Sequence, residues 1–251
     1  MDILTIRAFR ATDDPASCAE FLREHVRVLT DYGITHVNTN NADWITDPDV
    51  HVITVEHAEL GMVGGARVHV RTSADNHLPI ELAIGKLDPS IHELVRERAK
   101  DGVGELCGMW NAVRYHGKGM PTLFGLSAIS LASQLGIKTL LGLAARYTLD
   151  HSLDFGFRPV LSIGDQGVFH AYPRRGFQGI VVGIDDLLTL EHAIAPLRER
   201  ILSLRMAPDQ KRVERTTRTD LFIHYRMRLD NGIHDLATYD SIREDRLRYI
   251  A

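Results

Sequence analysis

The sequence predicts an α+β protein with a mixed, mostly antiparallel central sheet flanked by helices and a C-terminal helical extension. Residues 50–57 and 61–70 are two β-rich runs on either side of a turn-like "AELG", which is typical of a hairpin. Residues 104–163 follow the order strand, loop, helix, strand, helix, which requires a parallel strand pair. The chain therefore combines antiparallel and parallel pairing in one sheet.

The first third of the chain supplies the antiparallel part. Residues 3–9 alternate in hydropathy and predict a first strand, while 16–33 place apolar side chains at helical spacing. The predicted hairpin of 50–57 and 61–70 follows. Residues 72–103 are mixed: a polar loop, then "LPIELAIG", then "DPSIHELVRERAKDG", which predicts a short helix ended by Gly102.

The middle of the chain supplies the parallel part. Residues 104–113 predict a strand, and 122–136 predict a helix that Gly136 ends. The following segments are expected to be a buried strand, a helix and two further strands, the last of them closing the sheet: 137–145, 146–156, 157–164 and 179–185. Residues 1–185 are expected to form one domain.

Residues 186–251 differ in character from the rest of the chain. They open with an amphipathic helical pattern that Pro196 interrupts, and continue with the polar, partly basic "APDQKRVERTTRTD". We expect this tail to be a helical extension packed on the 1–185 domain.

Composition excludes several classes of function. The chain has 251 residues, is 44% hydrophobic and carries a formal net charge of -4, which does not suit a protein that works by non-specific nucleic-acid binding. Its two cysteines form no disulfide framework, and no HxxxH or HxH pair indicates a metal site. The most apolar window, 123–145, is interrupted by polar residues, and the first residues lack a signal-peptide pattern. We expect a cytoplasmic protein with no membrane span and no metal.

The segment "RYHGKGMP" (114–121) stands between a predicted strand and a predicted helix. Glycines before a helix let an anion approach the unpaired backbone N–H groups of its first turn, and proline is tolerated in that turn. Neither the GxxxxGK[ST] nor the GxGxxG pattern is present. A plain turn and a phosphate site of another kind both remain open on these residues alone.

The neighbouring residues resemble the GNAT acyltransferase superfamily. "GELCGMWNAVRYHGKGMP" is similar to that family's strand and phosphate loop, and "GLAARYTLDHSLDFGF" to the later helix that ends in "GF". The resemblance covers about residues 1–185. The long 72–103 segment, with "VGGARV" before it and "GELCGMW" after it, looks like the branch of acyl-homoserine-lactone synthases and N-acyl amino acid synthases.

The resemblance implies a site for the pyrophosphate of coenzyme A, or for the phosphopantetheine of an acyl carrier protein. Two registers of the loop motif R/Q-x-x-G-x-G/A compete. One uses Arg114, Gly117 and Gly119; the other uses His116, Gly119 and Pro121, and we prefer it because it also aligns the strand glutamate. Both registers place the phosphates on one loop, whose residues are Arg114, His116, Gly117, Lys118, Gly119 and Met120.

The resemblance also implies catalytic roles. Glu105 would be the general base that takes the proton of the amine. Backbone N–H groups around Met109, Trp110 and Asn111, near a bulge, would stabilise the oxyanion. The family's thiolate-protonating tyrosine would be at Ser152, so Tyr147 or His151 could substitute.

Cys107 offers a second chemistry, an acyl-cysteine intermediate, although a cysteine inside an apolar strand is more often a small buried hydrophobic residue.

These expectations describe an N-acyltransferase. It would move an acetyl or longer acyl group from acyl-CoA, or from an acyl carrier protein, to a small amine or amino acid. The alternative is a non-catalytic acyl-CoA-binding regulatory module that keeps the loop and has lost the chemistry. Nucleic acid is not expected as a partner, and the sequence leaves a homodimer open.

Overall fold

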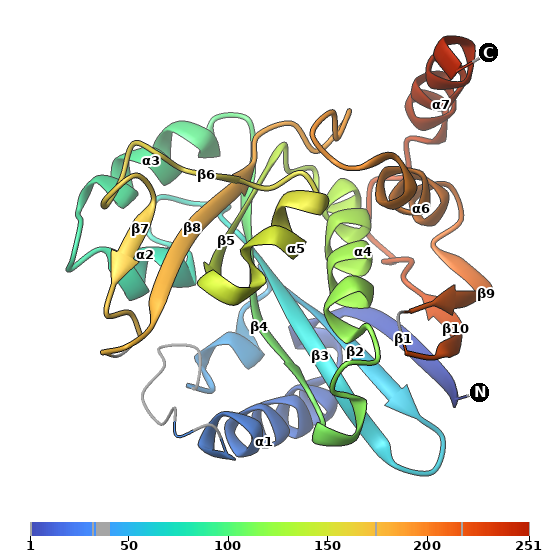
Figure 1. Cartoon of the computed structure of the whole chain (residues 1–251), viewed down its shortest axis with the longest axis horizontal. Coiled ribbons are helices and arrows are strands. Elements are labelled where there is room, and N and C mark those ends of the chain that lie inside the picture. The colour runs from blue at the N-terminus through green and yellow to red at the C-terminus, as the bar shows by residue number, and fades with distance from the viewer. Residues whose placement is uncertain (1, 32, 34–40, 174, 217, 251) are drawn as a thin grey trace.

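The computed structural model describes residues 2–31, 33, 41–173, 175–216 and 218–250. One large mixed sheet runs through the molecule, with strand order β6-β8-β5-β4-β3-β2-β1-β10-β9 and β7 paired with β8 (Figure 1). The strands are β1 (Asp2–Arg10), β2 (Val50–His57), β3 (Gly61–Val70), β4 (Val103–Asn111), β5 (Thr139–Ala145), β6 (Arg158–Pro159), β7 (Val168–His170), β8 (Gln178–Ile184), β9 (Asp209–Arg215) and β10 (Asp220–Arg226).

Helices cover both faces of the sheet (Figure 1). They are α1 (Pro15–Asp31), α2 (Pro79–Ile84), α3 (Ser90–Ala99), α4 (Met120–Ala132), α5 (Leu149–Asp154), α6 (Ala195–Met206) and α7 (Leu236–Ile250). Alternation along the strands separates the two faces. On β2, Val50 and Val52 pack with α1, whereas Ile53 and Val55 pack with α4. Helices α2 and α3 lie on the α1 face, and α5 and α6 lie on the α4 face.

The expected fold class is confirmed. The predicted hairpin is β2–β3, and the two parallel pairs of the sheet are β4–β5 and β1–β10. Helix α4 is apolar on all sides because it lies between the sheet and α6, so most of its side chains are buried.

One segment of the 1–185 region differs from the prediction. The strand expected over 157–164 is reduced to β6, which pairs with β8 only at Arg158 and Pro159. Residues 79–84, for which the sequence predicts no element, form the short helix α2, because Pro79 is well placed in its first turn and Glu81 closes a capping interaction on the N–H of Leu78.

The expectation that 179–185 is the last strand of the sheet is wrong. The tail adds the hairpin β9–β10, and β10 pairs in parallel with β1 in the register Asp2↔Leu221 to Arg7↔Arg226. The extension thus contains helices α6 and α7 and also two strands. Alternating burial on β10 shows why this segment forms a strand there: Leu221, Ile223 and Tyr225 face the core, and the residues between them are more exposed.

A buried carboxylate ties the hairpin to α6. Glu214 on β9 is 2% exposed, and it accepts a 2.8 Å hydrogen bond from the hydroxyl of Tyr225 and a second bond from Arg200 on α6. Helix α7 follows and stands out from the body of the molecule (Figure 1). Within the described residues, no helix is both long enough and apolar enough to cross a membrane.

Candidate active site

Strands β4 and β5 separate halfway along their length. They pair in parallel from Val103↔Thr139 to Leu106↔Gly142. Beyond that point β4 continues along β3, whereas β5 continues along β8, with Ala145 opposite Gly179. The divergence leaves a gap in the sheet that backbone hydrogen bonds do not close.

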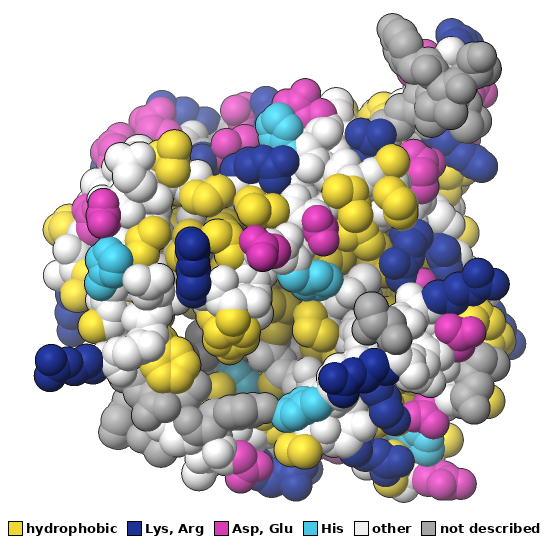
Figure 2. Space-filling view, viewed as in Figure 1, with side chains coloured by type: hydrophobic (Ala, Val, Ile, Leu, Met, Phe, Trp, Pro, Cys, Tyr) yellow, Lys and Arg dark blue, Asp and Glu magenta, His cyan; other side chains and the backbone are white. Residues whose placement is uncertain are grey.

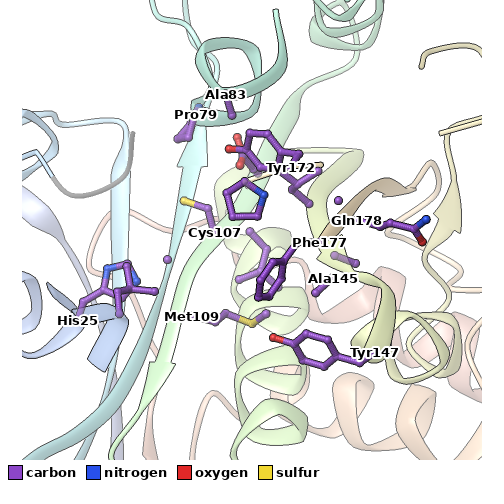
Figure 3. Close-up of a pocket in the computed structure, with 18 residues that line it drawn as sticks. His25, Pro79, Ala83, Cys107, Met109, Ala145, Tyr147, Tyr172, Phe177 and Gln178 are labelled. Atoms are coloured by element: carbon purple, nitrogen blue, oxygen red, sulfur yellow. The ribbon is translucent and has the colours of Figure 1, made fainter. Parts of the chain in front are cut away.

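A cavity of about 240 Å³ lies in this gap. Among the described residues its lining is mostly apolar and comes from α1, α2, both separating strands and the segment around β7 and β8: His25, Leu29, Pro79, Ala83, Glu105, Leu106, Cys107, Gly108, Met109, Leu143, Ala144, Ala145, Tyr147, Tyr172, Pro173, Phe177, Gln178 and Gly179 (Figure 3). On the molecular surface, hydrophobic side chains border the upper side of a hollow in the lower middle of the view (Figure 2). The cavity suits an apolar chain or a thioester better than a highly charged group.

Glu105 brings the one carboxyl group into this lining. Its side chain is 3% exposed, and its Oε2 accepts a 2.6 Å hydrogen bond from the backbone N–H of Ile80 on α2. Burial raises the pKa of Glu105 to about 8, although the Ile80 N–H and the charge of Arg67 act in the opposite direction and Glu81 adds to the rise. At neutral pH this carboxyl is therefore mostly protonated, and it becomes a base close to physiological pH.

Arg67 lies next to Gly108 of the cavity lining and was not anticipated. It is 1% exposed, and its guanidinium stacks 4.3 Å from the ring centre of Trp44. It is the main cation acting on Glu105 and on Cys107. The only sequence signal was an arginine inside the apolar run "VGGARV", which could equally have marked an exposed strand position.

A bulge interrupts β4 next to these groups. Arg67 is opposite Cys107 and Gly65 is opposite Trp110, so Gly108 and Met109 together face the single residue Ala66. Gly108 has a φ of +60°, and a Cβ on it would lie 2.9 Å from Nε of Arg67. Glycine is required there both by the left-handed backbone and by the close approach of the guanidinium.

The side chains of the three residues expected at the bulge lie in different places. Met109 lines the cavity. The Trp110 side chain turns into the core against Phe21 at 5.8 Å between ring centres, and the Asn111 side chain donates to the carbonyl of Ala112. Any contribution of the last two to the site would come through their backbone, as the resemblance implied.

Of the three candidates for protonating a leaving group, only one lines the cavity. Tyr147 lies on the cavity rim, 82% exposed, with its hydroxyl pointing toward Met109 (Figure 3). Ser152 lies on α5 outside the lining, and its hydroxyl donates to the carbonyl of Thr148 at 3.2 Å. His151 packs edge-on against Phe155, and burial lowers the pKa of its imidazole.

Tyr172 is a cavity residue that sequence reasoning missed. It belongs to the segment between β7 and β8, and burial together with the charge of Glu105 raises the pKa of its phenol. No motif marks this position, because its approach to β4 depends on the antiparallel return of β8 beside β5.

Cys107 also lines the cavity, but its chemistry is unfavourable. Burial raises the pKa of its thiol to about 12, so the group is a neutral thiol at physiological pH. The acyl-cysteine hypothesis loses support from this environment.

The glycine loop follows β4 and leads into α4. Gly117 and Gly119 have φ values of +73° and +78°, and Gly119 immediately precedes the helix, which begins at Met120, with Pro121 in its first turn. Met120 is itself buried in the core, so only its backbone is available at the loop. The predicted junction of strand, glycines and helix is thus present.

The basic residues of the loop have different contacts. Lys118 forms a 3.3 Å ion pair with Asp2 and lies 4.9 Å from the ring centre of Tyr115. Arg114, in the turn before the glycines, lies over the same ring at 5.7 Å. His116 is exposed at the end of this turn.

The tail hairpin reaches this loop. A Cβ on Gly117 would lie 2.6 Å from Nη1 of Arg218, and a Cβ on Gly119 would lie 2.5 Å from Cγ2 of Thr216. The turn between β9 and β10 therefore packs directly on the two glycines and adds the guanidinium of Arg218 to their surroundings.

Comparison with known proteins gives the fold a name. No protein-family model matches the sequence, and no curated protein matches it. Among solved structures, the N-acyl amino acid synthase FeeM from uncultured soil microbes superposes with a TM-score of 0.58 at 12% identity, covering 78% of this chain and 98% of FeeM.

Two further structures extend the comparison. ElaA from Escherichia coli has a TM-score of 0.51 at 12% identity and covers 72% of this chain and 98% of its own. The CoA-dependent acyl-homoserine lactone synthase BjaI has a TM-score of 0.51 at 11% identity and covers 96% and 99% of the two chains. At such identities the likeness concerns the fold alone, and the expected resemblance is confirmed at that level: the chain has a GNAT-like fold.

Proposed function

We propose that the protein is an N-acyltransferase that moves an acyl group from a CoA thioester to a small amine or amino acid. The observation that carries this proposal is Glu105: a buried carboxyl with a pKa near 8 in an otherwise mostly apolar cavity where two parallel strands separate. The deprotonated fraction of such a group, which grows as the pH approaches its pKa, can accept a proton close to physiological pH.

The reaction assigns a role to each part of the site. The amine nitrogen attacks the thioester carbonyl carbon while Glu105, directly or through a water molecule, takes the proton that the nitrogen loses. Backbone N–H groups near the Gly108–Met109 bulge would stabilise the oxyanion of the tetrahedral intermediate. The C–S bond then breaks, and the thiolate either leaves unprotonated or takes a proton from Tyr147.

The glycine loop supports the donor half of the proposal. Gly117 and Gly119 precede the start of α4, an end of a helix that carries partial positive charge and favours an anion. Arg218 adds positive charge beside Gly117, in keeping with a pyrophosphate ligand. We retain the register that uses His116, Gly119 and Pro121, because Gly119 and Pro121 flank the first residue of the helix.

The donor and the acyl length are part of the proposal. BjaI is described as CoA-dependent, and FeeM as an N-acyl amino acid synthase. The apolar lining from α2 and β5 favours an acyl chain longer than acetyl. A phosphopantetheine arm on an acyl carrier protein would use the same gap and is the alternative donor.

One observation favours the alternative function, an acyl-CoA-binding module without catalysis. The resemblance implies a tyrosine at a position that Ser152 occupies. The Ser152 hydroxyl donates a hydrogen bond to the carbonyl of Thr148, and the residue lies outside the cavity. This binder would keep the loop and lack the acid that releases the thiol.

The test is acyl-CoA turnover, measured as free thiol, with a panel of small amines and amino acids. Before turnover is measured, the rise in Tm with acetyl-CoA and with long-chain acyl-CoA identifies the preferred donor, because a ligand that binds the folded state stabilises it by mass action. Thiol release that depends on an amine supports the enzyme. A raised Tm without thiol release for any amine supports the binding module. If Tm does not rise with acetyl-CoA, long-chain acyl-CoA or acyl carrier protein, both the enzyme and the binding module are contradicted.

A further inference from the structure

Three side chains within residues 77–92 meet on the α2–α3 side of the molecule. His77 lies just before α2, Glu81 is in α2, and His92 is in α3. The Nδ1 atoms of the two imidazoles lie 3.2 Å (His77) and 3.0 Å (His92) from the same carboxylate oxygen, Oε1 of Glu81. All three ligand-type atoms lie within 4.8 Å of one another.

These separations suit a tetrahedral transition-metal ion. Zinc binds imidazole nitrogen and carboxylate oxygen at about 2.0–2.1 Å, which places two ligands of a tetrahedral site roughly 3.3 Å apart. The two nitrogen–oxygen distances require only a small outward adjustment to admit an ion between the three atoms. Two imidazoles and one carboxylate also match the ligand preference of zinc.

The carboxylate is already oriented for this task. Its other oxygen, Oε2, accepts a 2.9 Å hydrogen bond from the backbone N–H of Leu78 and pairs with Arg71. Glu81 is 1% exposed, so its rotamer is fixed, and Oε1 is the oxygen directed at the imidazoles. Hydrogen bonds to the second oxygen of a ligating carboxylate are the usual support of a metal ligand.

The imidazoles leave one side of the trio accessible. The side chains of His77 and His92 are 45% and 44% exposed. An ion could therefore enter from solvent and take water as its fourth ligand. Without an ion, each Nδ1–H would donate to Oε1, so the same distances also fit a hydrogen-bonded arrangement; the two interpretations predict different metal affinities.

We propose that His77, Glu81 and His92 form a binding site for a divalent transition-metal ion, Zn²⁺ above all, that fastens α2 to α3. The site lies outside the cavity lining and does not depend on the proposed acyl transfer. A bound ion would also fix the position of α2 beside the cavity, because the Ile80 N–H of α2 donates a hydrogen bond to Glu105. The sequence did not indicate the site because His77 and His92 are fifteen positions apart, a spacing typical of no metal motif.

The experiment uses the full chain after removal of metal by a chelator and dialysis. Co²⁺ is titrated in, and the visible absorption bands of the cobalt ion report the coordination geometry; Zn²⁺ is then added in competition, and Tm is recorded at increasing zinc concentration. We expect one equivalent to bind, with tetrahedral cobalt bands that zinc removes, and a Tm that rises with zinc.

Single-ligand variants decide between a metal site and hydrogen bonds alone. His77→Ala and His92→Ala should each weaken metal binding at least about tenfold, since each removes one of three protein ligands. His170→Ala is the matched control: His170 also lies 3.2 Å from a carboxylate, that of Asp165, and belongs to no such trio among the described residues. All three positions are about half exposed, so circular dichroism should show unchanged folds.

The proposal is overturned if cobalt and zinc show no saturable one-to-one binding. It is equally overturned if His77→Ala and His92→Ala bind metal as tightly as the wild type and the His170→Ala control.

Discussion

The backbone N–H of Ile80 donates a 2.6 Å hydrogen bond to Oε2 of Glu105 and so connects α2 to the middle of β4. This contact holds a carboxyl group in a largely apolar cavity while leaving its second oxygen for other partners. Burial favours the neutral acid and the N–H favours the carboxylate, and burial dominates, since the pKa is raised to about 8. The balance produces a base of intermediate strength.

Replacing Glu105 with glutamine should abolish most of the turnover without unfolding the protein. The amide oxygen can still accept from Ile80, but it cannot take a proton from the amine. Removing a general base typically costs about 10²–10⁴-fold in rate. Thiol release measured alongside Tm checks this, and unchanged turnover in Glu105→Gln would show that Glu105 is not the base.

The acidity of Glu105 predicts a pH-dependent rate. Only the carboxylate can act as a base, so kcat/KM should rise about tenfold per pH unit below pH 8 and level off above it. A rate that is flat from pH 6 to 9 would contradict the assignment.

Stability should change with pH in the opposite direction to the rate. The pKa of Glu105 is raised on folding, so the native state holds a proton that the unfolded state releases above its ordinary pKa of 4.5. The stabilisation is complete below that value and is lost as pH rises toward 8. The free energy of unfolding of the wild type, compared with that of Glu105→Gln, should decline over this interval.

The glycine loop predicts a binding defect in Gly119→Ala. Gly119 has a φ of +78°, and a Cβ would lie 2.5 Å from Cγ2 of Thr216, so the new methyl group would strain the backbone and push the hairpin turn away. We expect a loss of about 1–2 kcal/mol in the free energy of unfolding and an acyl-CoA Kd raised by about tenfold or more.

Gly176→Ala is the control for that prediction. Gly176 has a φ of +93°, but no described atom lies within 4 Å of a Cβ built there. It should show the backbone strain alone and bind acyl-CoA normally. Calorimetric titration of both variants separates the two effects, and equal affinities would remove the loop from the donor site.

Tyr147 and Ser152 provide a test of the leaving-group acid. Tyr147→Phe should lower turnover by up to about tenfold, because only its hydroxyl on the cavity rim is removed, whereas Ser152→Ala should leave turnover unchanged, since its hydroxyl serves the helix carbonyl of Thr148. Pre-steady-state thiol release distinguishes this step from binding. An effect in Ser152→Ala alone would reverse the assignment.

Much of the fold could be predicted because local pattern and tertiary environment agree. The alternation of β1 and the apolar runs of β2, β3 and β5 read directly as strands. The segments that were missed obtain their structure from neighbours. The sequence of β9 is polar and charged, and it becomes a strand because β10 pairs with it and Glu214 is neutralised by side chains from elsewhere.

The site was predictable to a similar extent. Glu105 and the glycine loop could be found because a linear motif contains them. Arg67 and Tyr172 could not, because their relation to Glu105 depends on the β3–β4 bulge and on the return of β8 beside β5. Sequence reasoning thus located the groups on β4 and its loop and missed those that other elements bring to them.

The pairing of β1 with β10 has a consequence for synthesis of the protein. Residues 2–7 are synthesised long before their partners, residues 221–226, so one edge of β1 stays unpaired by β10 until more than two hundred further residues have been added. A nascent chain that ends at residue 185 would expose that edge for pairing with another chain. The strands from β1 to β8 can pair before the hairpin is made, but the free edge of β1 is covered only when β10 arrives.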